Sequence, residues 1–315
     1  MVDRETINKI IEYGTYAPSS HNSQPWQFTF GEKKIEISPD FTRRLIHGDR
    51  QDRQLFISLG CAAENIRQAS EAFGFEPSVD VVDGKITVTL GEKEIKYQNS
   101  ETLLAIKNRI TSRYAYAFDD RIQELLDFIK NLQEDCVHFF ICERELKAKL
   151  ADVAVKASVE AMDDIEFRKE LSRYVKNNTT SSRVGMPAYG MGVPTFISYI
   201  VPIVLRFVNA NRLSRQTDSK LLKERTPYVV VIATKNDDKS SWLKTGFLYE
   251  RIALEAEKRG FSAALWAAPI EIGDNYKNFQ ALLSTRFRPQ AFFRLGKATK
   301  KPPRSPRLTL QEVLK

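Results

Sequence analysis

The chain has 315 residues, of which 42% are hydrophobic and 28% are charged, a balance typical of a soluble globular protein with one large or two medium domains. Its three cysteines, Cys61, Cys136 and Cys142, are odd in number and form no CxxC motif, which argues against a disulfide framework and against a zinc site. The first residues form no apolar run of the kind that opens a signal peptide, so we expect a cytoplasmic protein.

The formal net charge of +8 predicts an anionic partner. Much of this charge lies near the end of the chain, between Lys297 and Lys315. No basic helix with interleaved aromatic residues accompanies it, as would be expected of a nucleic-acid binder. A cofactor that carries phosphate is therefore favoured over nucleic acid.

The first hundred residues predict two helices and several strands. Helix 55–73 has apolar residues spaced at threes and fours and ends at Gly74, where a C-terminal cap belongs. Asp83-Gly84 lies between two apolar alternations and fits a type I′ hairpin turn. The full set is a helix over 7–13, a helix over 55–73, a strand ending at Phe30, and strands over 33–37, 79–82, 85–90 and 94–97.

A second series of elements begins near residue 102. Its predicted helices span 103–110, 122–132, 143–161, 164–176 and 244–259, and its predicted strands span 137–142, 228–234 and 290–296.

Glycines and prolines break the regular pattern between residues 177 and 225, around an apolar run at 196–208. This run is too short to span a membrane and contains Pro202. We favour a lid over a ligand, or a buried segment, over a helix that lies on a membrane surface.

The most specific motif lies at residues 17–28, which read Ala-Pro-Ser-Ser-His-Asn-Ser-Gln-Pro-Trp-Gln-Phe. Two prolines fix the backbone around compact donor and acceptor side chains, which suits a polar ligand better than a turn that only caps two elements. The run resembles the signature of the FMN-dependent nitroreductase family, in which it contacts a flavin across a dimer interface. The resemblance implies cofactor-binding roles for Pro18, Ser19, Ser20, Asn22 and Gln24.

Three further segments resemble flavin-binding positions of the same family. The run 109–113 resembles the segment that grips the FMN phosphate, through Arg109, Thr111 and Arg113. Two guanidinium forks and a hydroxyl suit a phosphate by charge-assisted hydrogen bonding, although a solvated arginine pair is the alternative.

The other two segments lie toward the end of the chain. Pro269, Ile270 and Glu271 resemble the loop beneath the edge of the flavin ring, where main-chain amides approach it; a plain strand-to-helix turn is the alternative. Arg304 and Arg307 resemble the basic C-terminal motif that adds charge at the phosphate, and a solvated basic tail is the alternative.

Residues 55–75 align without gaps on residues 241–261, which indicates an internal repeat. Gly60 aligns with Gly246 and Glu64 with Glu250. A glycine inside a helix costs roughly 1 kcal/mol relative to alanine, so a repeated one needs a reason. Chance similarity between two capped amphipathic helices is the alternative. Each helix resembles the long central helix of the nitroreductase fold, whose glycine permits another backbone to approach closely.

The resemblance therefore implies an α+β, nitroreductase-like fold with two related halves, residues 1–100 and 101–315. We expect these to form an intramolecular pseudo-dimer around mixed or antiparallel sheets flanked by helices, with a lid insertion at about 177–225. The first half holds residues 17–28, which we call the Pro-Ser loop. The second half holds residues 109–113, which we call the Arg-rich segment. One flavin site per chain follows, and we expect the fused chain to be a monomer.

The implied function is an FMN-dependent oxidoreductase that takes a hydride from NAD(P)H and reduces a small acceptor such as a nitroaromatic or a quinone. We assign no catalytic side chain and no metal ligand, because His21, His47 and His138 lack metal-ligand spacing and a nucleophile motif. The alternatives are a non-enzymatic FMN-binding or storage protein with an occluding lid, and a membrane-surface or interaction protein that uses residues 196–208.

Overall fold

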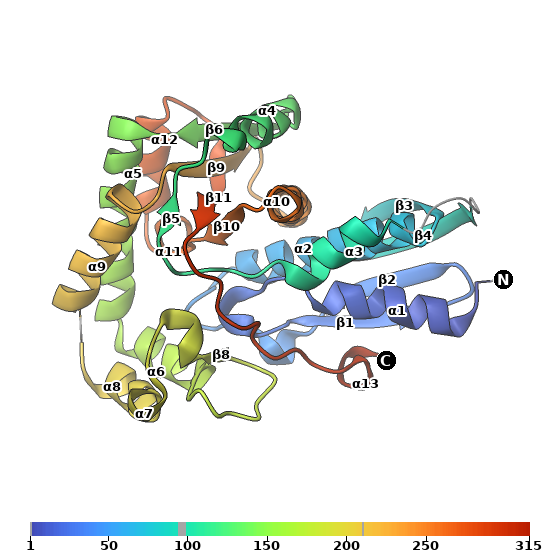
Figure 1. The fold of residues 1–315 in the computed structure, drawn as a ribbon, viewed down its shortest axis with the longest axis horizontal. Coiled ribbons are helices and arrows are strands. Elements are labelled where there is room, and N and C mark those ends of the chain that lie inside the picture. The colour runs from blue at the N-terminus through green and yellow to red at the C-terminus, as the bar shows by residue number, and fades with distance from the viewer. Residues whose placement is uncertain (1, 94–98, 210) are drawn as a thin grey trace.

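The computed structural model describes residues 2–93, 99–209 and 211–315, in which helices and antiparallel strands form two adjoining units (Figure 1). The first unit contains, in order, α1 (Arg4–Thr15), η1 (Ser20–Asn22), β1 (Trp26–Phe30), β2 (Lys34–Pro39), η2 (Phe41–Arg43), α2 (Arg53–Ala72), β3 (Phe75–Val82) and β4 (Lys85–Lys93). Its strands form an antiparallel sheet of order β1-β2-β4-β3. The expected extension of this sheet over 94–97 lies outside the described residues.

The second unit holds a further antiparallel sheet, of order β10-β11-β9-β6, with β5 paired to β11. Its elements up to the end of the helical insertion are α3 (Ser100–Asn108), β5 (Tyr116–Ala117), η3 (Asp120–Ile122), α4 (Gln123–Asn131), β6 (Val137–Cys142), α5 (Arg144–Asp163), α6 (Ile165–Tyr174), β7 (Val175–Lys176), β8 (Met186–Pro187), η4 (Ala188–Met191), α7 (Thr195–Ser198), α8 (Val201–Phe207) and α9 (Asn211–Lys223). The rest are β9 (Tyr228–Thr234), α10 (Lys239–Lys258), β10 (Ser262–Leu265), α11 (Ala268–Glu271), α12 (Asn275–Leu282), β11 (Arg288–Ala298) and α13 (Leu310–Val313).

The predicted α+β class is confirmed, and the local signals act as their chemistry requires. Helix α2 ends before Gly74 and α10 before Gly260, and both glycines have the positive φ of a left-handed cap (88° and 76°). Asp83 and Gly84 also have positive φ, as a type I′ turn between β3 and β4 demands. Every strand pair in these two sheets is antiparallel, so neither sheet is mixed, and β7 and β8 form a separate parallel pair.

The two sheets share one strand order. Replacing β1, β2, β3 and β4 by β6, β9, β10 and β11 converts the order of the first sheet into that of the second. In each unit a 20-residue helix, α2 or α10, connects the second strand to the third. The first residues of these helices, and their last residues, are both 186 positions apart, which is also the offset of the ungapped sequence alignment. Common topology supports the proposal that the halves are related.

Helices α2 and α10 pack directly on each other (Figure 1). A Cβ on Gly60 would overlap the carbonyl oxygen of Leu243, and a Cβ on Gly246 would overlap that of Ile57. Leu243 follows Ile57 by the same 186 positions, so each helix makes the same contact with the other. The close backbone approach expected of these glycines is confirmed, and one hydrophobic core continues through both units.

The connection between β6 and β9 contains α5 to α9, whereas β1 and β2 are joined by a short turn. Within it, residues 196–208 were expected to be a lid or a buried segment. The prediction of a buried segment is wrong, because α8 has no buried residue and Phe196 and Phe207 are 79% and 73% exposed. The helical pattern at 164–176 also ends earlier than expected, because Val175 and Lys176 pair with β8.

Gly60→Ala should destabilise the protein by about 1–3 kcal/mol, the usual effect of overpacking a closed contact. Its new methyl group would meet backbone of α10, which cannot move aside as a flexible side chain could. Gly31→Ala is the control, because nothing lies within 4 Å of a Cβ there. Chemical denaturation measures both, and equal stability of the two variants would contradict the account.

Candidate functional site

The Pro-Ser loop lies between α1 and β1, with three non-glycine residues in the left-handed region: His21, Asn22 and Gln24, at φ of 53°, 55° and 52°. Backbone in this region is costly for such residues and persists where its surroundings hold it. The Asn22 amide donates to the carbonyls of Gly185 (2.9 Å) and Pro306 (3.0 Å). The loop therefore joins the segment around Gly185, which precedes η4, to the C-terminal tail.

Gln24 makes the same two connections. Its amide nitrogen donates to the Arg183 carbonyl at 2.7 Å, and its amide oxygen accepts from the Leu308 N–H at 2.9 Å. Ser19 Oγ accepts from the main-chain N–H of Gln24 at 2.9 Å and fixes the loop internally. Pro18 and Ser20 flank these groups and are half-buried. In this structure the side-chain amides of Asn22 and Gln24 are hydrogen-bonded to main-chain groups of other segments of the protein.

Three arginines meet beside this loop. Arg109, at the end of α3, donates to the Tyr16 carbonyl at 2.9 Å. Arg307 in the tail donates to Asn22 Oδ1 at 2.6 Å and to the same Tyr16 carbonyl at 3.5 Å. The Arg304 guanidinium lies 4.7 Å from the centre of the Tyr16 ring and donates to the Ile106 carbonyl at 3.3 Å. We call Arg109, Arg304 and Arg307 the arginine cluster.

One buried carboxylate, Glu250 on α10, faces the arginine cluster. Its Oε1 lies 2.9 Å from Arg109 Nε, but the pair is not aligned as a hydrogen bond, since both Glu250 oxygens lack one. Burial raises the pKa of Glu250 to about 7, against the pull of Arg109. Burial, followed by repulsion from the other guanidinium groups, lowers the pKa of Arg304 to about 10 and that of Arg307 to about 9.

The arginine cluster retains unused donors. Arg109 Nη1, Arg304 Nη1 and Arg307 Nε are buried and have no hydrogen-bond partner within the described chain. A buried polar group without a partner is costly, and a buried charge more so. Three guanidinium groups against one carboxylate leave a local excess of positive charge. The arrangement is suited to hold a compact dianion such as a phosphate.

The two arginines of the Arg-rich segment, Arg109 and Arg113, have different surroundings. Arg113 points elsewhere: its Nη2 lies 3.4 Å from Met186 Sδ, and Asp218 of α9 attracts it. Burial of the guanidinium lowers its pKa, against the pull of Asp218. Thr111 is half-buried between the two arginines. Sequence reasoning brought Arg109 and Arg113 to one phosphate, whereas in this structure only Arg109 joins the cluster.

Two further residues of this region were not identified from the sequence. Arg294 of β11 is buried and donates to the carbonyls of Ser112 (2.8 Å) and Tyr114 (3.0 Å), which fixes the Arg-rich segment. Burial raises the pKa of Asp218 to about 6, against the pull of Arg113. A charged residue inside the apolar strand 290–296 was the one signal that could have indicated Arg294.

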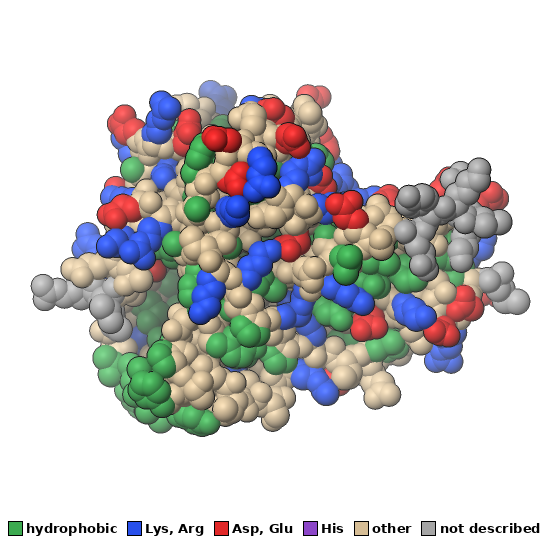
Figure 2. Space-filling model, in the orientation of Figure 1, with side chains coloured by type: hydrophobic (Ala, Val, Ile, Leu, Met, Phe, Trp, Pro, Cys, Tyr) green, Lys and Arg blue, Asp and Glu red, His purple; other side chains and the backbone are tan. Residues whose placement is uncertain are grey.

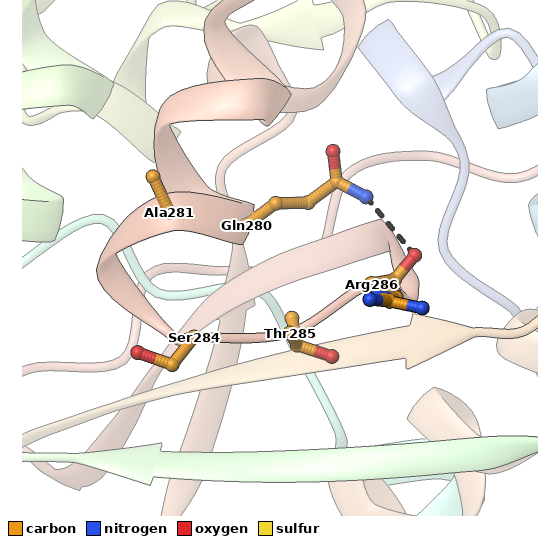
Figure 3. Close-up of a pocket in the computed structure, with 5 residues that line it drawn as sticks. All are labelled: Gln280, Ala281, Ser284, Thr285 and Arg286. Atoms are coloured by element: carbon orange, nitrogen blue, oxygen red, sulfur yellow. Dashed lines mark hydrogen bonds between the residues drawn. The ribbon is translucent and has the colours of Figure 1, made fainter.

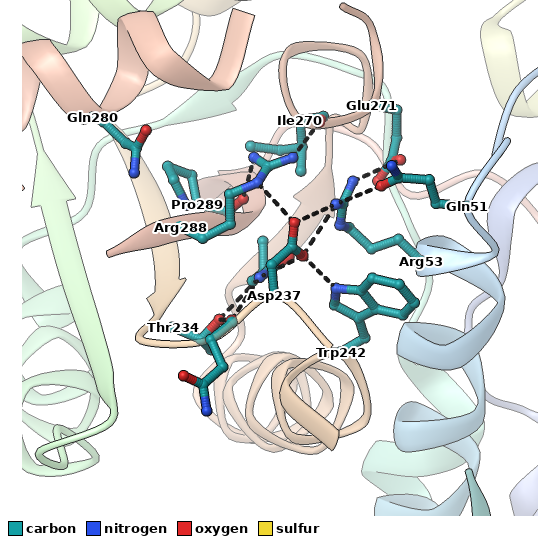
Figure 4. Close-up of polar contacts among 12 residues, drawn as sticks. Gln51, Arg53, Thr234, Asp237, Trp242, Ile270, Glu271, Gln280, Arg288 and Pro289 are labelled. Carbon is teal, nitrogen blue, oxygen red and sulfur yellow. Dashed lines mark hydrogen bonds and ion pairs between the residues drawn. The ribbon is translucent and has the colours of Figure 1, made fainter. Parts of the chain in front are cut away.

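Pro269, Ile270 and Glu271 lie in α11. Ile270 and Glu271 belong to a separate polar network (Figure 4). The Glu271 carboxylate accepts from Arg53 at 3.1 Å and from Gln54 at 2.9 Å, both on α2. The main-chain amides of Ile270 and Glu271 both donate to the Ala267 carbonyl. The donors expected to face a flavin edge are thus engaged in the helix, and the Glu271 carboxylate connects the two units.

Asp237 is the second carboxylate of this network (Figure 4). It accepts from Arg53 (3.0 Å), Trp242 Nε1 (2.7 Å) and Arg288 Nε (3.2 Å). Burial disfavours its charge, but the hydrogen bond from Trp242 and the charge of Arg53 outweigh burial and lower its pKa. The network stabilises the junction between α2, α10 and α11.

Other candidate sites are poorer. The turn between α12 and β11 forms a surface recess lined by Gln280, Ala281, Ser284, Thr285 and Arg286 (Figure 3). The Gln280 side chain there donates to the Arg286 carbonyl at 3.2 Å, and Arg286 is the one charged lining residue. Among the described residues, no group of three or more His, Cys, Asp or Glu side chains is placed to hold a metal. No described helix is both long and apolar enough to cross a membrane.

Comparisons with known proteins show similarity to one protein family and to several of its named proteins. Residues 1–105 match the profile of the Nitroreductase family. Two Mycobacterium tuberculosis proteins that carry the name "Putative NAD(P)H nitroreductase" align along almost the whole chain. One is 24% identical over 99% of this chain and 92% of its own length, and the other is 22% identical over 99% and 96%.

Solved structures also resemble this fold. The FMN-dependent nitroreductase NfnB from Mycobacterium smegmatis, in complex with NADPH, has a TM-score of 0.45 at 14% identity, over 69% of this chain and 97% of that one. A nitroreductase-like protein from Bacillus cereus has a TM-score of 0.38 at 15% identity, over 70% and 96%. At these identities and TM-scores the likeness carries no functional argument.

The protonation state of Glu250 should control anion affinity at the arginine cluster. As pH rises through about 7 the carboxyl loses its proton, and the new negative charge offsets part of the positive field. Sulfate, a dianion throughout this range, should therefore bind about tenfold more weakly above the transition than below it. Glu250→Gln, which stays neutral, should show no such fall in calorimetric titrations of the flavin-free protein.

Glu64→Gln is the matched control for this titration. Glu64 occupies the aligned position on α2 and is also fully buried, but it pairs with Arg67 at 2.7 Å and Arg251 at 2.9 Å. The fall in sulfate affinity should persist in this variant. Loss of the fall in Glu64→Gln, or its absence from the wild type, would contradict the assignment to Glu250.

Proposed function

We propose that this chain is an FMN-dependent oxidoreductase of the nitroreductase family, because residues 1–105 match the profile of that family. Its electron donor is NADH or NADPH, and its acceptor is a small electron-poor molecule such as a nitroaromatic or a quinone. The names of the mycobacterial relatives, which align along the whole chain, support an NAD(P)H-dependent enzyme over a protein that only stores flavin.

The arginine cluster is the observation that carries this proposal. Arg109 is buried and Arg304 and Arg307 are half-buried, and each has a buried nitrogen without a partner in the described chain. The three guanidinium groups face a single carboxylate. The phosphate of FMN would supply both the counter-charge and the acceptors. A solvated basic tail, the alternative from the sequence, does not fit Arg307, whose pKa falls to about 9 because of burial.

Both units contribute to this site, which supports the division at about residue 100. Arg109, Arg304 and Arg307 belong to the second unit, while Asn22 and the Tyr16 carbonyl belong to the first. The loop that separates α1 from β1 has no counterpart of its length between α4 and β6. We therefore propose one flavin site in each fused pseudo-dimer.

When bound, FMN would accept a hydride from the nicotinamide and pass electrons to the acceptor. The chain's own residues bind and orient it. The arginine cluster would hold the phosphate, assisted by Thr111 and by Ser19 and Ser20 of the Pro-Ser loop. Asn22 and Gln24 form hydrogen bonds to residues 183–185 and to the C-terminal tail, which fixes both segments against the Pro-Ser loop.

The purified protein should be yellow, and NADH or NADPH added without oxygen should bleach it. Addition of a nitroaromatic should then restore the oxidised visible spectrum, because the reduced flavin returns its electrons to the acceptor. If dithionite bleaches the protein but neither nicotinamide does, the proposed electron donor is wrong.

Arg304→Ala combined with Arg307→Ala should release FMN. Each charge-assisted hydrogen bond contributes roughly 1.5–3 kcal/mol, so the double variant should bind FMN at least about a hundredfold more weakly. Arg109 is left in place because its loss would also strand the buried Glu250. Arg286→Ala, an exposed arginine of the recess in Figure 3, is the control. Flavin fluorescence titration measures all three proteins, and unchanged affinity in the double variant would place the phosphate elsewhere.

A further inference from the structure

Helices α7 and α8 carry an apolar face that no other part of the described chain covers. Eight of the fifteen exposed large apolar residues lie between positions 196 and 208. They are Phe196, Ile197, Tyr199, Ile200, Ile203, Val204, Phe207 and Val208. Figure 2 shows hydrophobic side chains gathered at the corner of the molecule where α7 and α8 lie. We call these eight residues the apolar face.

The helices that carry the apolar face pack against other elements of the protein. Helix α8 packs on α6, and the Tyr199 hydroxyl is 2.8 Å from Thr179 Oγ1. The Arg206 guanidinium lies 5.5 Å from the centre of the Phe207 ring, so a cation sits at the border of the face. The apolar side chains are thus presented by packed helices, and a patch of this kind usually marks an interaction site.

The segment that carries the apolar face has an excess of positive charge. Residues 177–225 contain seven basic and two acidic residues, and Arg183 and Lys223 pair with Glu312 and Asp152 outside the segment, which leaves a net charge of +3. Arg206, Arg215 and Lys220 are exposed. Figure 2 shows further Lys and Arg side chains near α9, on the same side of the molecule as the apolar corner. Large apolar groups bordered by Arg and Lys are the composition of helices that lie in a membrane interface.

We propose that the apolar face docks on an anionic membrane surface. Phe196 and Phe207 enter the headgroup layer, while the basic residues of α8 and α9 lie over anionic headgroups. The charge selects this occupant over a second copy of the chain, because two segments that each carry this positive excess would repel each other across a symmetric contact. Docking at the interface needs no membrane-spanning helix, and it does not depend on the bound cofactor.

Flotation of the full-length protein with lipid vesicles tests this proposal. Vesicles of phosphatidylcholine and phosphatidylserine in equal parts should carry the protein upward, and vesicles of phosphatidylcholine alone should carry much less. Raising the salt from about 0.1 M to about 1 M should weaken the binding, since the screening length falls from about 10 to about 3 Å. Phe196→Ser with Phe207→Ser should lower the partition coefficient at least about tenfold.

Two further variants separate the contributions. Phe41→Ser with Phe118→Ser removes two phenylalanines that are 49% and 60% exposed elsewhere, and it should float like the wild type. Arg206→Glu with Arg215→Glu should remove the preference for anionic vesicles. Failure of the wild type to float would overturn the proposal. So would a concentration-dependent dimer in sedimentation that only Phe196→Ser with Phe207→Ser abolishes, because the face would then be a contact between copies.

Discussion

The packing of α2 on α10 at Gly60 and Gly246 is the contact on which the other features of the molecule depend. Each glycine weakens its own helix by roughly 1 kcal/mol relative to alanine, and close packing of two long buried helices offsets this cost. The contact brings Arg53 of α2 to Asp237 and Glu271 of the second unit. It also fixes α10, whose Glu250 faces Arg109.

The two aligned helices each carry a buried glutamate, Glu64 on α2 and Glu250 on α10, but the two carboxylates have different partners. This difference distinguishes the candidate site from the surroundings of Glu64. Glu64 accepts hydrogen bonds from Arg67 and Arg251, which outweigh burial and lower its pKa. Glu250 has no aligned donor, and burial raises its pKa to about 7. The excess guanidinium groups lie beside Glu250, so the proposed anion site is placed there and not beside Glu64.

Local signals made much of the fold predictable, because caps and turns depend on a few adjacent residues. Gly74 and Gly260 end their helices and Asp83-Gly84 forms its turn as expected. The candidate site depends on contacts between distant segments, which spacing does not encode. The backbone after α3 is extended at Arg109 and directs Arg113 away from the cluster, and the role of Glu250 appears only when the tail is in place. The exposure of 196–208 likewise depends on which helices cover it, so hydropathy alone suggested burial.

The central claim is that two unequal halves build one flavin site. Its most direct test is the molar ratio of FMN to protein, measured from the visible absorbance of flavin released by denaturation and from amino-acid analysis of the same sample, after saturation with FMN and removal of the excess. One FMN per 36.1 kDa chain is expected. A ratio of two would reveal a second site on the Glu64 side, and a chain that takes up no FMN would contradict the account.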